Sequence, residues 1–388
     1  MKHNFKYARL VALALCVCLL LPLGGCNGDE PVQKQIFAMD TVMNITAYGK
    51  DAKAGIDAAV GVINSLDDVL DPNNEGSYAY QINHAEGQDV VVTPQVNEML
   101  TTALSGYALS GGALDLSVYP LYETWGEFQD ETGTVPDDDT IKELRKSLGF
   151  GKTEITDFDG EGNFSVRMPA GTQISFGSVA KGCASKYAID ALRKSGVESG
   201  IVSLGGNVQT LGTKPDGSNW TVAVEDPNNP GSYVGTLSVG ETAIITSGSY
   251  QRYFTAADGT KYHHIIDPST GYPADNDLVS VTIVCKDGTL ADCLSTAMFV
   301  LGQSAALNYW RNNGGFDMIM ITKDNKVLCT TGLLEMFSLT NKTDYTLKMV
   351  ERCRAASFSG RTPSRLPRHS SVSCSCERSP TGASCACA

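Results

Sequence analysis

The stretch that decides the fold runs from residue 262 to residue 299 and reads YHHIIDPSTGYPADNDLVSVTIVCKDGTLADCLSTAMF. Its first part places a histidine pair before the segment 267–271 (DPSTG), whose residue types are typical of a turn. Residues 278–285 alternate apolar and polar side chains and are rich in β-branched residues, which predicts a strand. The remainder has apolar residues at helical spacing, and we expect a helix capped by Thr289 and ended by Gly302.

Two oxygen-bearing side chains, Asp292 and Thr296, lie four residues apart in this predicted helix. That spacing places them on one helix face, where a carboxylate and a hydroxyl would offer Mg²⁺ the hard oxygen ligands that it prefers. A structural interpretation stays open, because an acidic residue near a helix start also interacts with the helix dipole and a threonine in a helix also bonds a backbone carbonyl. His264 is likewise either a catalytic or a structural histidine.

The composition is that of a globular protein with an acidic body. The chain has 388 residues, of which 42% are hydrophobic and 19% charged, and these values argue against disorder. The segment 26–350 holds 21 basic and 41 acidic residues, a net charge of −20. Nucleic acid is therefore an unfavourable partner, and a phosphorylated ligand would need a cation such as Mg²⁺ to screen its charge.

The N-terminal segment 1–25 has the pattern of a signal peptide, with three basic residues before an apolar run over 10–23. It ends in LGGC at 23–26, which looks like a bacterial lipobox. We expect cleavage before Cys26, lipidation of its thiol, and a linker over 26–34, so that the protein is lipid-anchored at the extracytoplasmic face of the cell membrane. The alternative is an ordinary signal peptide with an accidental cysteine.

The rest of the chain mixes helices and strands without strict alternation, which favours an α+β fold. We expect one large domain over residues 35–345, followed by a low-complexity Arg/Ser/Cys tail over 346–388 that is either disordered or a frameshifted reading. The clearest elements are a strand over 35–48, a helix over 52–70, a polar loop over 76–83, a helix begun by Thr93-Pro94, and strands near 201–204, 220–225, 242–246, 316–321 and 327–329.

Residues 174–196 form a second stretch that could bind a ligand, and they read ISFGSVAKGCASKYAIDALRKSG. A strand end meets the Gly177-Ser178 turn and a helix begins, with Lys181 in its first turn. Helix N-termini after glycine turns commonly bind phosphate, although this segment lacks the spacing of a P-loop. The scattered cysteines of the domain have no metal-like spacing and predict small buried residues, with a Cys183–Cys293 disulfide left open.

Taken together, these segments resemble the ApbE family of flavin transferases. The matching pieces occur in the family's order and are AMDT (38–41), the 77–83 loop, GALD (112–115), SVAKG (178–182), SLGGN (203–207), TSGSY (246–250), HIIDP with TGYP (264–273), and AD with STA (291–297). The resemblance implies an ApbE-like, T-fold-type arrangement of mixed sheets with packed helices in a single catalytic domain.

The resemblance also implies an enzyme that uses FAD and Mg²⁺ to move FMN onto a Thr or Ser hydroxyl of an acceptor flavoprotein, with release of AMP. The acceptor would carry a Ser/Thr-Gly-Ala-Thr/Ser-like motif. By matching positions, Mg²⁺ would be held by the Ser178 carbonyl, Asp292 and Thr296, and His264 would be the general base. The residues that would line FAD are Met39, Ala113, Leu114, Asp115, Ser175, Lys181 and Ile266.

Two positions depart from the family pattern. Ser175 lies where many relatives carry Asp, and Asn73 falls near a position where relatives commonly place an aromatic residue over the flavin. The region of Asn73 is linked in the family to the choice between FMN transfer and FAD hydrolysis. Two alternatives to the transferase therefore stay open: a Mg²⁺-dependent FAD pyrophosphatase giving FMN and AMP, and a lipid-anchored flavin-binding protein without catalysis.

Overall fold

The computed structural model describes residues 30–126, 128 and 133–352. The predicted signal peptide, Cys26 and the part of the predicted tail from residue 353 lie outside the described residues. The largest element is a nine-stranded sheet with the order β1-β2-β6-β7-β10-β13-β14-β15-β17. All neighbours in it are antiparallel except β15 and β17, which are parallel.

In chain order the strands of this sheet are β1 (Val32–Ala38), β2 (Thr41–Ala47), β6 (Gly200–Leu204), β7 (Asn207–Leu211), β10 (Ala243–Gly248), β13 (Leu278–Cys285), β14 (Asp317–Thr322), β15 (Lys326–Thr330) and β17 (Thr346–Val350). The smaller sheets are made by β3 (Val90–Val92), β5 (Phe164–Arg167) and β4 (Glu154–Asp157), by β16 (Phe337–Leu339), β9 (Tyr233–Val239) and β8 (Trp220–Glu225), and by β11 (Tyr253–Thr255) and β12 (Lys261–His263). The helices are α2 (Ala52–Leu70), α3 (Tyr78–Asn83), α4 (Pro94–Ser110), α5 (Tyr119–Trp125), α6 (Asp138–Arg145), α7 (Ala180–Lys194) and α8 (Gly288–Asn313), with 3-10 turns η1 (Leu116–Val118), η2 (Phe150–Lys152) and η3 (Thr331–Leu333).

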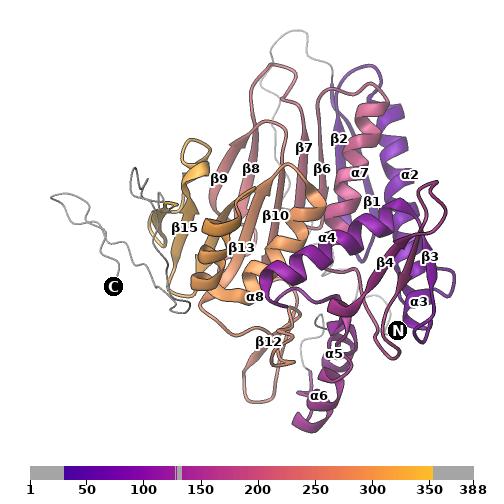
Figure 1. Ribbon diagram of the computed structural model, residues 1–388. Helices are drawn as coiled ribbons and strands as arrows, with labels where there is room; N and C mark the ends of the chain where they lie inside the picture. Colours follow the sequence, from indigo (N-terminus) through magenta and orange to yellow (C-terminus); the bar gives the residue numbers. More distant parts are fainter. Residues whose placement is uncertain (1–29, 127, 129–132, 353–388) are drawn as a thin grey trace, which may run out of the picture. The chain divides into compact units, whose positions relative to one another are not determined.

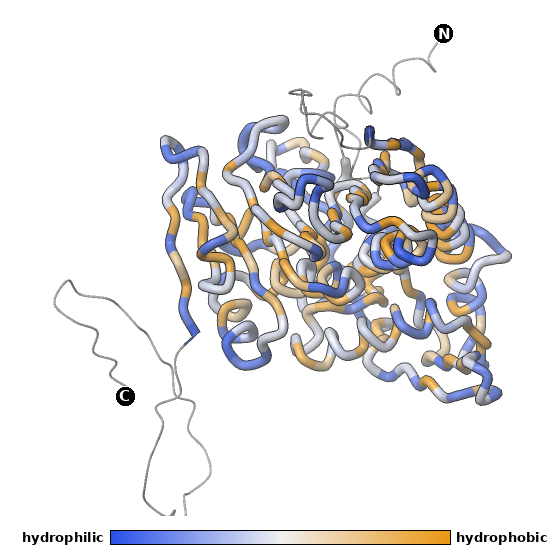
Figure 2. The backbone as a smooth tube through the Cα atoms, turned by 90° about the horizontal axis from the view of Figure 1, so that it is seen from above, coloured by the Kyte–Doolittle hydropathy of each residue, from blue (hydrophilic) through white to orange (hydrophobic). Residues whose placement is uncertain are grey.

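The large sheet lies between two layers. Helices α2, α4, α7 and α8 cover one of its faces (Figure 1), and their apolar stripes form the main core with that face. The sheet β16-β9-β8 packs on the other face through a second core that includes Trp220, Leu237 and Ile319. Because both faces are covered, β13 is buried almost throughout. Figure 2 shows the same distribution, with apolar segments inside and hydrophilic loops at the ends of the strands.

Helix α8 differs from its prediction at both ends. Its N-cap is Asp287, whose carboxylate accepts a hydrogen bond from the backbone N–H of Leu290 at 2.9 Å, and the predicted cap Thr289 is already inside the helix. Gly302 does not end the helix but kinks it, with φ 72° and ψ 172°, and helical structure continues to Asn313. Within the described residues α8 is the one helix apolar and long enough to cross a membrane, and 61% of that apolar window is buried inside the fold.

The predicted strand over 35–48 is instead a hairpin of β1 and β2. Met39 and Asp40 form its two-residue turn with φ of 47° and 56°, and Ala38 pairs with Thr41. Two positive φ values are typical of a type I′ turn. Asn-Gly is the usual sequence of such a turn, so Met-Asp does not predict it. The predicted loop over 76–83 was also wrong in part, because Ser77 caps the short helix α3 by accepting a hydrogen bond from the N–H of Tyr80 at 2.9 Å.

The folded body extends beyond both predicted domain limits. Strand β1 begins at Val32 rather than 35, and β17 lies wholly inside the segment 346–388 that was predicted as a tail. β17 pairs with β15 along its full length, and Val350 at its end is 6% exposed. Between β15 and β17 the chain forms η3 and then β16, which belongs to another sheet. No local sequence pattern therefore indicates that β17 pairs with β15.

A small apolar cluster carries the DPSTG turn. Trp125, Phe128 and Phe254 pack together, with Ile266 beside them, between α5, α6 and the β11–β12 hairpin. The indole N–H of Trp125 donates to the carbonyl oxygen of Gly271 at 2.8 Å, which fixes the turn against α5. The turn and the histidines before it are therefore held by a rigid aromatic support.

Candidate active site

Helices α7 and α8 approach each other closely where each carries a glycine. A Cβ at Gly182 would lie 2.2 Å from the carbonyl oxygen of Gly288 and 2.5 Å from Cβ of Asp292. A Cβ at Gly288 would lie 2.6 Å from the carbonyl oxygen of Gly182. Only glycine fits at both positions, and this contact brings the first turn of α7 against the side chain of Asp292.

Asp292 holds that first turn with one of its two carboxylate oxygens. Its Oδ2 accepts a hydrogen bond from the backbone N–H of Gly182 at 2.8 Å, and the residue is 4% exposed. Gly182 lies in the first turn of α7, whose N-cap is Val179, so this N–H has no acceptor within its own helix. Within the described residues, the Ser178 carbonyl before the helix and Oδ1 of Asp292 have no hydrogen-bond donor. Two of the three predicted metal ligands retain a free oxygen.

Thr296, the third predicted ligand, is bonded to a side chain and not to its own helix. Ser295 donates to the carbonyl oxygen of Asp292 at 2.9 Å, and its Oγ lies 2.8 Å from Oγ of Ser247 on β10. Ser247 must therefore donate to Ser295, which leaves it to accept from the Thr296 hydroxyl at 3.3 Å. The lone pairs of Thr296 stay available, so the structural alternative of a carbonyl-bonded threonine does not apply here.

The N-terminus of α7 also offers groups for an anion. Lys181 makes a single hydrogen bond, from Nζ to the Gly177 carbonyl oxygen at 3.2 Å, and no carboxylate pairs with it among the described residues. In that part of the chain the backbone N–H groups of Ser178 and Lys181 likewise have no acceptor. A helix N-terminus with free N–H groups and an unpaired lysine suits a phosphate.

His264 lies directly after β12 and is bonded to the loop that precedes β11. Its Nδ1 donates to the carbonyl oxygen of Arg252 at 3.2 Å, so that in the neutral ring Nε2 carries the lone pair. Burial, together with the positive charges of Arg252 and Lys181, lowers the pKa of His264 to about 3. The charge of Lys181 makes the smallest of these contributions to the pKa of His264.

Arg252 joins three parts of the site. Its guanidinium donates to the carbonyl oxygen of Asp40 in the β1–β2 turn at 3.4 Å. It also hydrogen-bonds Tyr122 on α5, where burial raises the pKa of the phenol and the arginine opposes the rise. The turn that carries Met39, a predicted FAD contact, is in this way linked to the loop that carries His264. The backbone N–H of Met39 donates to Asp67 at 3.0 Å, which fixes the turn further.

The other predicted FAD residues divide into two groups. Ser175 lies beside the 113–116 loop, because its N–H donates to the Leu116 carbonyl at 3.2 Å, and its hydroxyl accepts from the N–H of Gly177. Asp115 accepts from the N–H of Ser117 at 2.8 Å, and burial raises its pKa. Ala113 is half-buried in the same loop.

In contrast, the side chains of Leu114 and Ile266 are 1% and 5% exposed and belong to apolar cores. They shape the surrounding loops and present only backbone to a ligand.

Sequence reasoning missed Ser247 and Arg252, which contact Thr296 and His264. Ser247 lies in β10 within the TSGSY motif, and Arg252 follows that motif just before β11. The described residues hold no group of three or more His, Cys, Asp or Glu side chains that could bind a metal, so the candidate magnesium site rests on one carboxylate. Cys183 and Cys293 are both free thiols, which closes the question of their disulfide.

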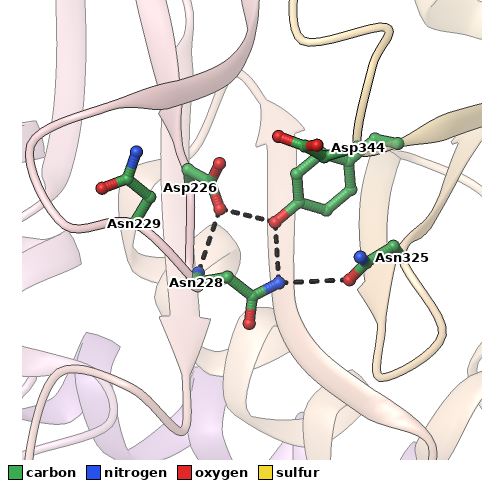
Figure 3. Close-up of a pocket in the computed structure, with 6 residues that line it drawn as sticks. Asp226, Asn228, Asn229, Asn325 and Asp344 are labelled. Atoms are coloured by element: carbon green, nitrogen blue, oxygen red, sulfur yellow. Dashed lines mark hydrogen bonds between the residues drawn. The ribbon is translucent and has the colours of Figure 1, made fainter.

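A pocket of about 600 Å³ lies elsewhere and includes none of the predicted residues. Asp226 and Tyr345 hydrogen-bond to each other in it, and Asn228 bridges Tyr345 to Asn325 (Figure 3). These bonds tie the β8–β9 loop to the start of β17, and they explain why the fold continues past residue 345.

The comparisons with known proteins identify the family of the chain. The family model described as the ApbE family matches residues 39–320. An FAD:protein FMN transferase of Treponema pallidum is 31% identical over 359 residues, covering 86% of this chain and 96% of the relative.

Two solved structures share the fold. The ApbE protein of Thermotoga maritima is 29% identical with a TM-score of 0.67, over 76% of this chain and 94% of that one. The flavin transferase ApbE of Vibrio cholerae is 26% identical with a TM-score of 0.67, over 80% and 96%. The predicted α+β fold and the predicted resemblance are both confirmed, and this chain belongs to the ApbE family.

Proposed function

We propose that this protein is a Mg²⁺-dependent FAD:protein FMN transferase, which moves FMN from FAD to a Ser or Thr hydroxyl of an acceptor flavoprotein. The transferase activity follows from family membership and from the transferases among its relatives. The observation that carries the site assignment is that Ser178, Asp292 and Thr296 each keep an oxygen that the fold does not use, while Asp292 is bonded to the first turn of α7.

The residues present fit Mg²⁺. A backbone carbonyl, a carboxylate and a hydroxyl are hard oxygen ligands, and none of them is fully used by the fold. When bound there, Mg²⁺ would neutralise charge on the phosphoryl oxygens of FAD. With only one carboxylate in the set, its affinity would depend on those phosphate oxygens as further ligands.

Lys181 and the N–H groups of the first turn of α7 would bind the pyrophosphate of FAD. The acceptor hydroxyl oxygen forms a bond to the phosphorus of the FMN half while the bond from that phosphorus to the bridging oxygen breaks. AMP leaves with the bridging oxygen, and the hydroxyl proton passes to Nε2 of His264. FMN thus becomes linked to the acceptor by a phosphoester bond.

The low pKa of His264 is compatible with this role only when substrate is bound. In the free protein the ring is neutral at physiological pH and its lone pair is available, but a base with a pKa of about 3 is weak. The negative pyrophosphate would offset the charges of Arg252 and Lys181 and raise the pKa of His264, while burial, the largest cause of its low value, would remain. Substrate binding itself would then activate the base.

The pyrophosphatase alternative is favoured by one observation. Asn73 is exposed in the loop after α2, where its N–H donates to Asp71 at 2.8 Å, and it provides no aromatic cover near the site. A site open to water there would allow hydrolysis of FAD to FMN and AMP with the same residues.

The location of the enzyme in the cell and the identity of its acceptor are also proposals. A lipid on Cys26 would hold the catalytic domain at the extracytoplasmic face of the membrane, where acceptor flavoproteins with a Ser/Thr-Gly-Ala-Thr/Ser-like motif would be its partners. The support is the LGGC pattern at residues 23–26 and family membership.

Incubation of the protein with FAD, Mg²⁺ and a peptide carrying the acceptor motif tests the function. A peptide whose mass rises by one FMN unit, with AMP in equal amount, supports the transferase. Free FMN and AMP without modified peptide would instead establish the pyrophosphatase. Tight FAD binding with neither product would leave only a flavin-binding protein.

A further inference from the structure

Asn207 has a buried side-chain amide that the fold does not use. The residue is 2% exposed, and its Nδ2 has no hydrogen-bond partner. Buried amide groups are nearly always hydrogen-bonded, because burial of an unpaired donor opposes folding. The amide also makes no bond to the Gly205-Gly206 turn that precedes it, where a structural asparagine would act.

The position of Asn207 in the sheet places this amide beneath the first turn of α7. Asn207 begins β7, and Gln209 two residues later points to the same, helix-covered face. Gln209 accepts a hydrogen bond from Ser185 of α7 at 3.0 Å. Ser185 lies one helical turn after Lys181, so Asn207, one step back along the strand, lies next to the turn that carries Lys181 and Gly182.

The neighbouring strand brings the candidate metal site to the same place. Val208 pairs with Ile244 of β10, and this register sets Ile245 opposite Asn207. Ser247, two residues further along that face, contacts Thr296. Asn207 therefore lies on the face of the sheet that meets the N-terminus of α7, Lys181 and the proposed Mg²⁺ ligands, where the helix, the lysine and a bound cation would attract an anion.

We propose that Asn207 is a substrate-binding residue whose amide donates a hydrogen bond to a phosphate oxygen of FAD. This inference rests on the proposed function and adds a donor from the sheet to those from α7. A neutral donor buried in a polar, helix-capped site discriminates phosphate from the uncharged flavin ring, which offers no anionic oxygen. The hydrogen bond lost in the free protein is recovered when the substrate binds.

The substitution Asn207→Leu in the full-length protein, which keeps the size and removes the amide, tests this role. Dissociation constants are measured with Mg²⁺ for FAD, for ADP, which has the adenosine and the two phosphates but no flavin, and for riboflavin, which has the flavin but no phosphate. We expect FAD and ADP to bind roughly 10- to 100-fold more weakly, the effect of a hydrogen bond to a charged group, and riboflavin to bind as before. The melting temperature without ligand should stay the same or rise, because an unpaired buried donor has been removed.

Ser199→Ala is the matched control, since Ser199 Oγ is also buried without a partner but lies by β6 at the far end of the sheet. It should leave all three affinities unchanged. Unchanged affinities for FAD and ADP in Asn207→Leu would overturn the proposal while FMN transfer by the unaltered protein stands. Equal weakening of riboflavin binding would also overturn it.

If Asn207→Leu does not fold, Asn207→Asp is used instead. Its carboxylate should repel the phosphates of ADP and weaken ADP binding, and unchanged ADP binding would contradict the proposal. Failure of the unaltered protein to bind FAD and ADP would overturn the proposed function and this inference together.

Discussion

At the scale of single residues, the decisive feature is how each side chain is left partly unsatisfied. Asp292 uses one oxygen to hold α7 and keeps the other, and Thr296 donates its proton to Ser247 and keeps its lone pairs. His264 donates from one ring nitrogen and keeps the other. Structural residues normally use all such groups, so the pattern distinguishes ligand-binding residues from packing ones.

Asp292→Asn should separate the two roles of this residue. An amide oxygen can still accept from the N–H of Gly182, so the melting temperature should fall by only a few degrees, while loss of the anionic ligand should raise the Mg²⁺ concentration for half-maximal transfer by at least about 10-fold. A titration of transfer against Mg²⁺ measures this. The exposed Asp159→Asn serves as control, and unchanged Mg²⁺ dependence would remove Asp292 from the metal site.

His264→Ala should lower the transfer rate at saturating FAD by about 10²–10⁴-fold while FAD affinity changes only a few-fold. The exposed His84→Ala, on α3, should change neither quantity. Recovery of the rate at high FAD would mean that His264 only supports the loop.

The pH profile of the unaltered enzyme checks the same residue. The neutral ring is the active form, and its pKa is about 3 without substrate. The acidic limb of kcat should therefore lie at higher pH than the acidic limb of kcat/KM, because bound pyrophosphate raises the pKa. Coincident limbs would contradict activation by the substrate.

At the scale of elements, the site depends on the contact between α7 and α8. This contact is supported by Lys186 of α7, whose Nζ lies 2.6 Å from Glu98 of α4 and 2.7 Å from Asp287 at the start of α8. One half-buried ion-pair network thus joins three helices near the proposed metal site. The hairpin turns at 39–40 and 205–206 complete the site from the sheet.

Gly182→Ala should disturb both the fold and the site. The added methyl group would meet backbone atoms of α8, so the helices must separate, at a cost of about 1–3 kcal/mol or more in the free energy of unfolding and with weaker Mg²⁺-dependent FAD binding. Gly61→Ala in α2 is the matched control, because a Cβ there meets nothing within 4 Å and should stabilise the protein by about 0.5–1 kcal/mol. Chemical denaturation and FAD titration measure the two effects, and equal stability of both variants would rule out the close approach.

At the scale of the whole molecule, two half-buried histidines couple stability to pH. Burial lowers the pKa of His263 to about 4 and that of His264 to about 3, both below the unfolded value of about 6.5. Below pH 6.5 the histidines bind protons in the unfolded chain but not in the native chain. Their contribution to the free energy of unfolding is therefore complete above this pH and is lost as the pH falls. Carboxyl groups such as Asp115 and Glu225, whose pKa values burial raises, act in the opposite direction.

We therefore expect the free energy of unfolding to fall between pH 6 and pH 5, with each histidine contributing up to about 1.4 kcal/mol per pH unit. Urea denaturation at several pH values measures the slope. Replacing both residues with Gln should flatten the profile, whereas His84→Gln should leave it unchanged. A slope that survives the double replacement would assign the effect to other groups.

The sequence by itself determined the local elements and the chemistry available. The stripe of apolar residues in α2, the strand β13 and the turn before α7 follow from periodicity and turn residues, and the family motifs named Asp292, Thr296, Ser178 and Lys181 as one set. These features depend on neighbours within a few positions, which is why one-dimensional patterns predict them.

Only the tertiary structure decided what depends on contacts between distant segments. The Met39-Asp40 turn, the pairing of β17 with β15, the kink at Gly302 and the unused amide of Asn207 have no local signature. One oxygen of Asp292 is used by the N–H of Gly182 and the other stays free, and this follows from the approach of α7 to α8. A hydrogen bond has a partner or lacks one only after the chain has packed, so the sequence names the groups and the packing decides which of them remain for a ligand.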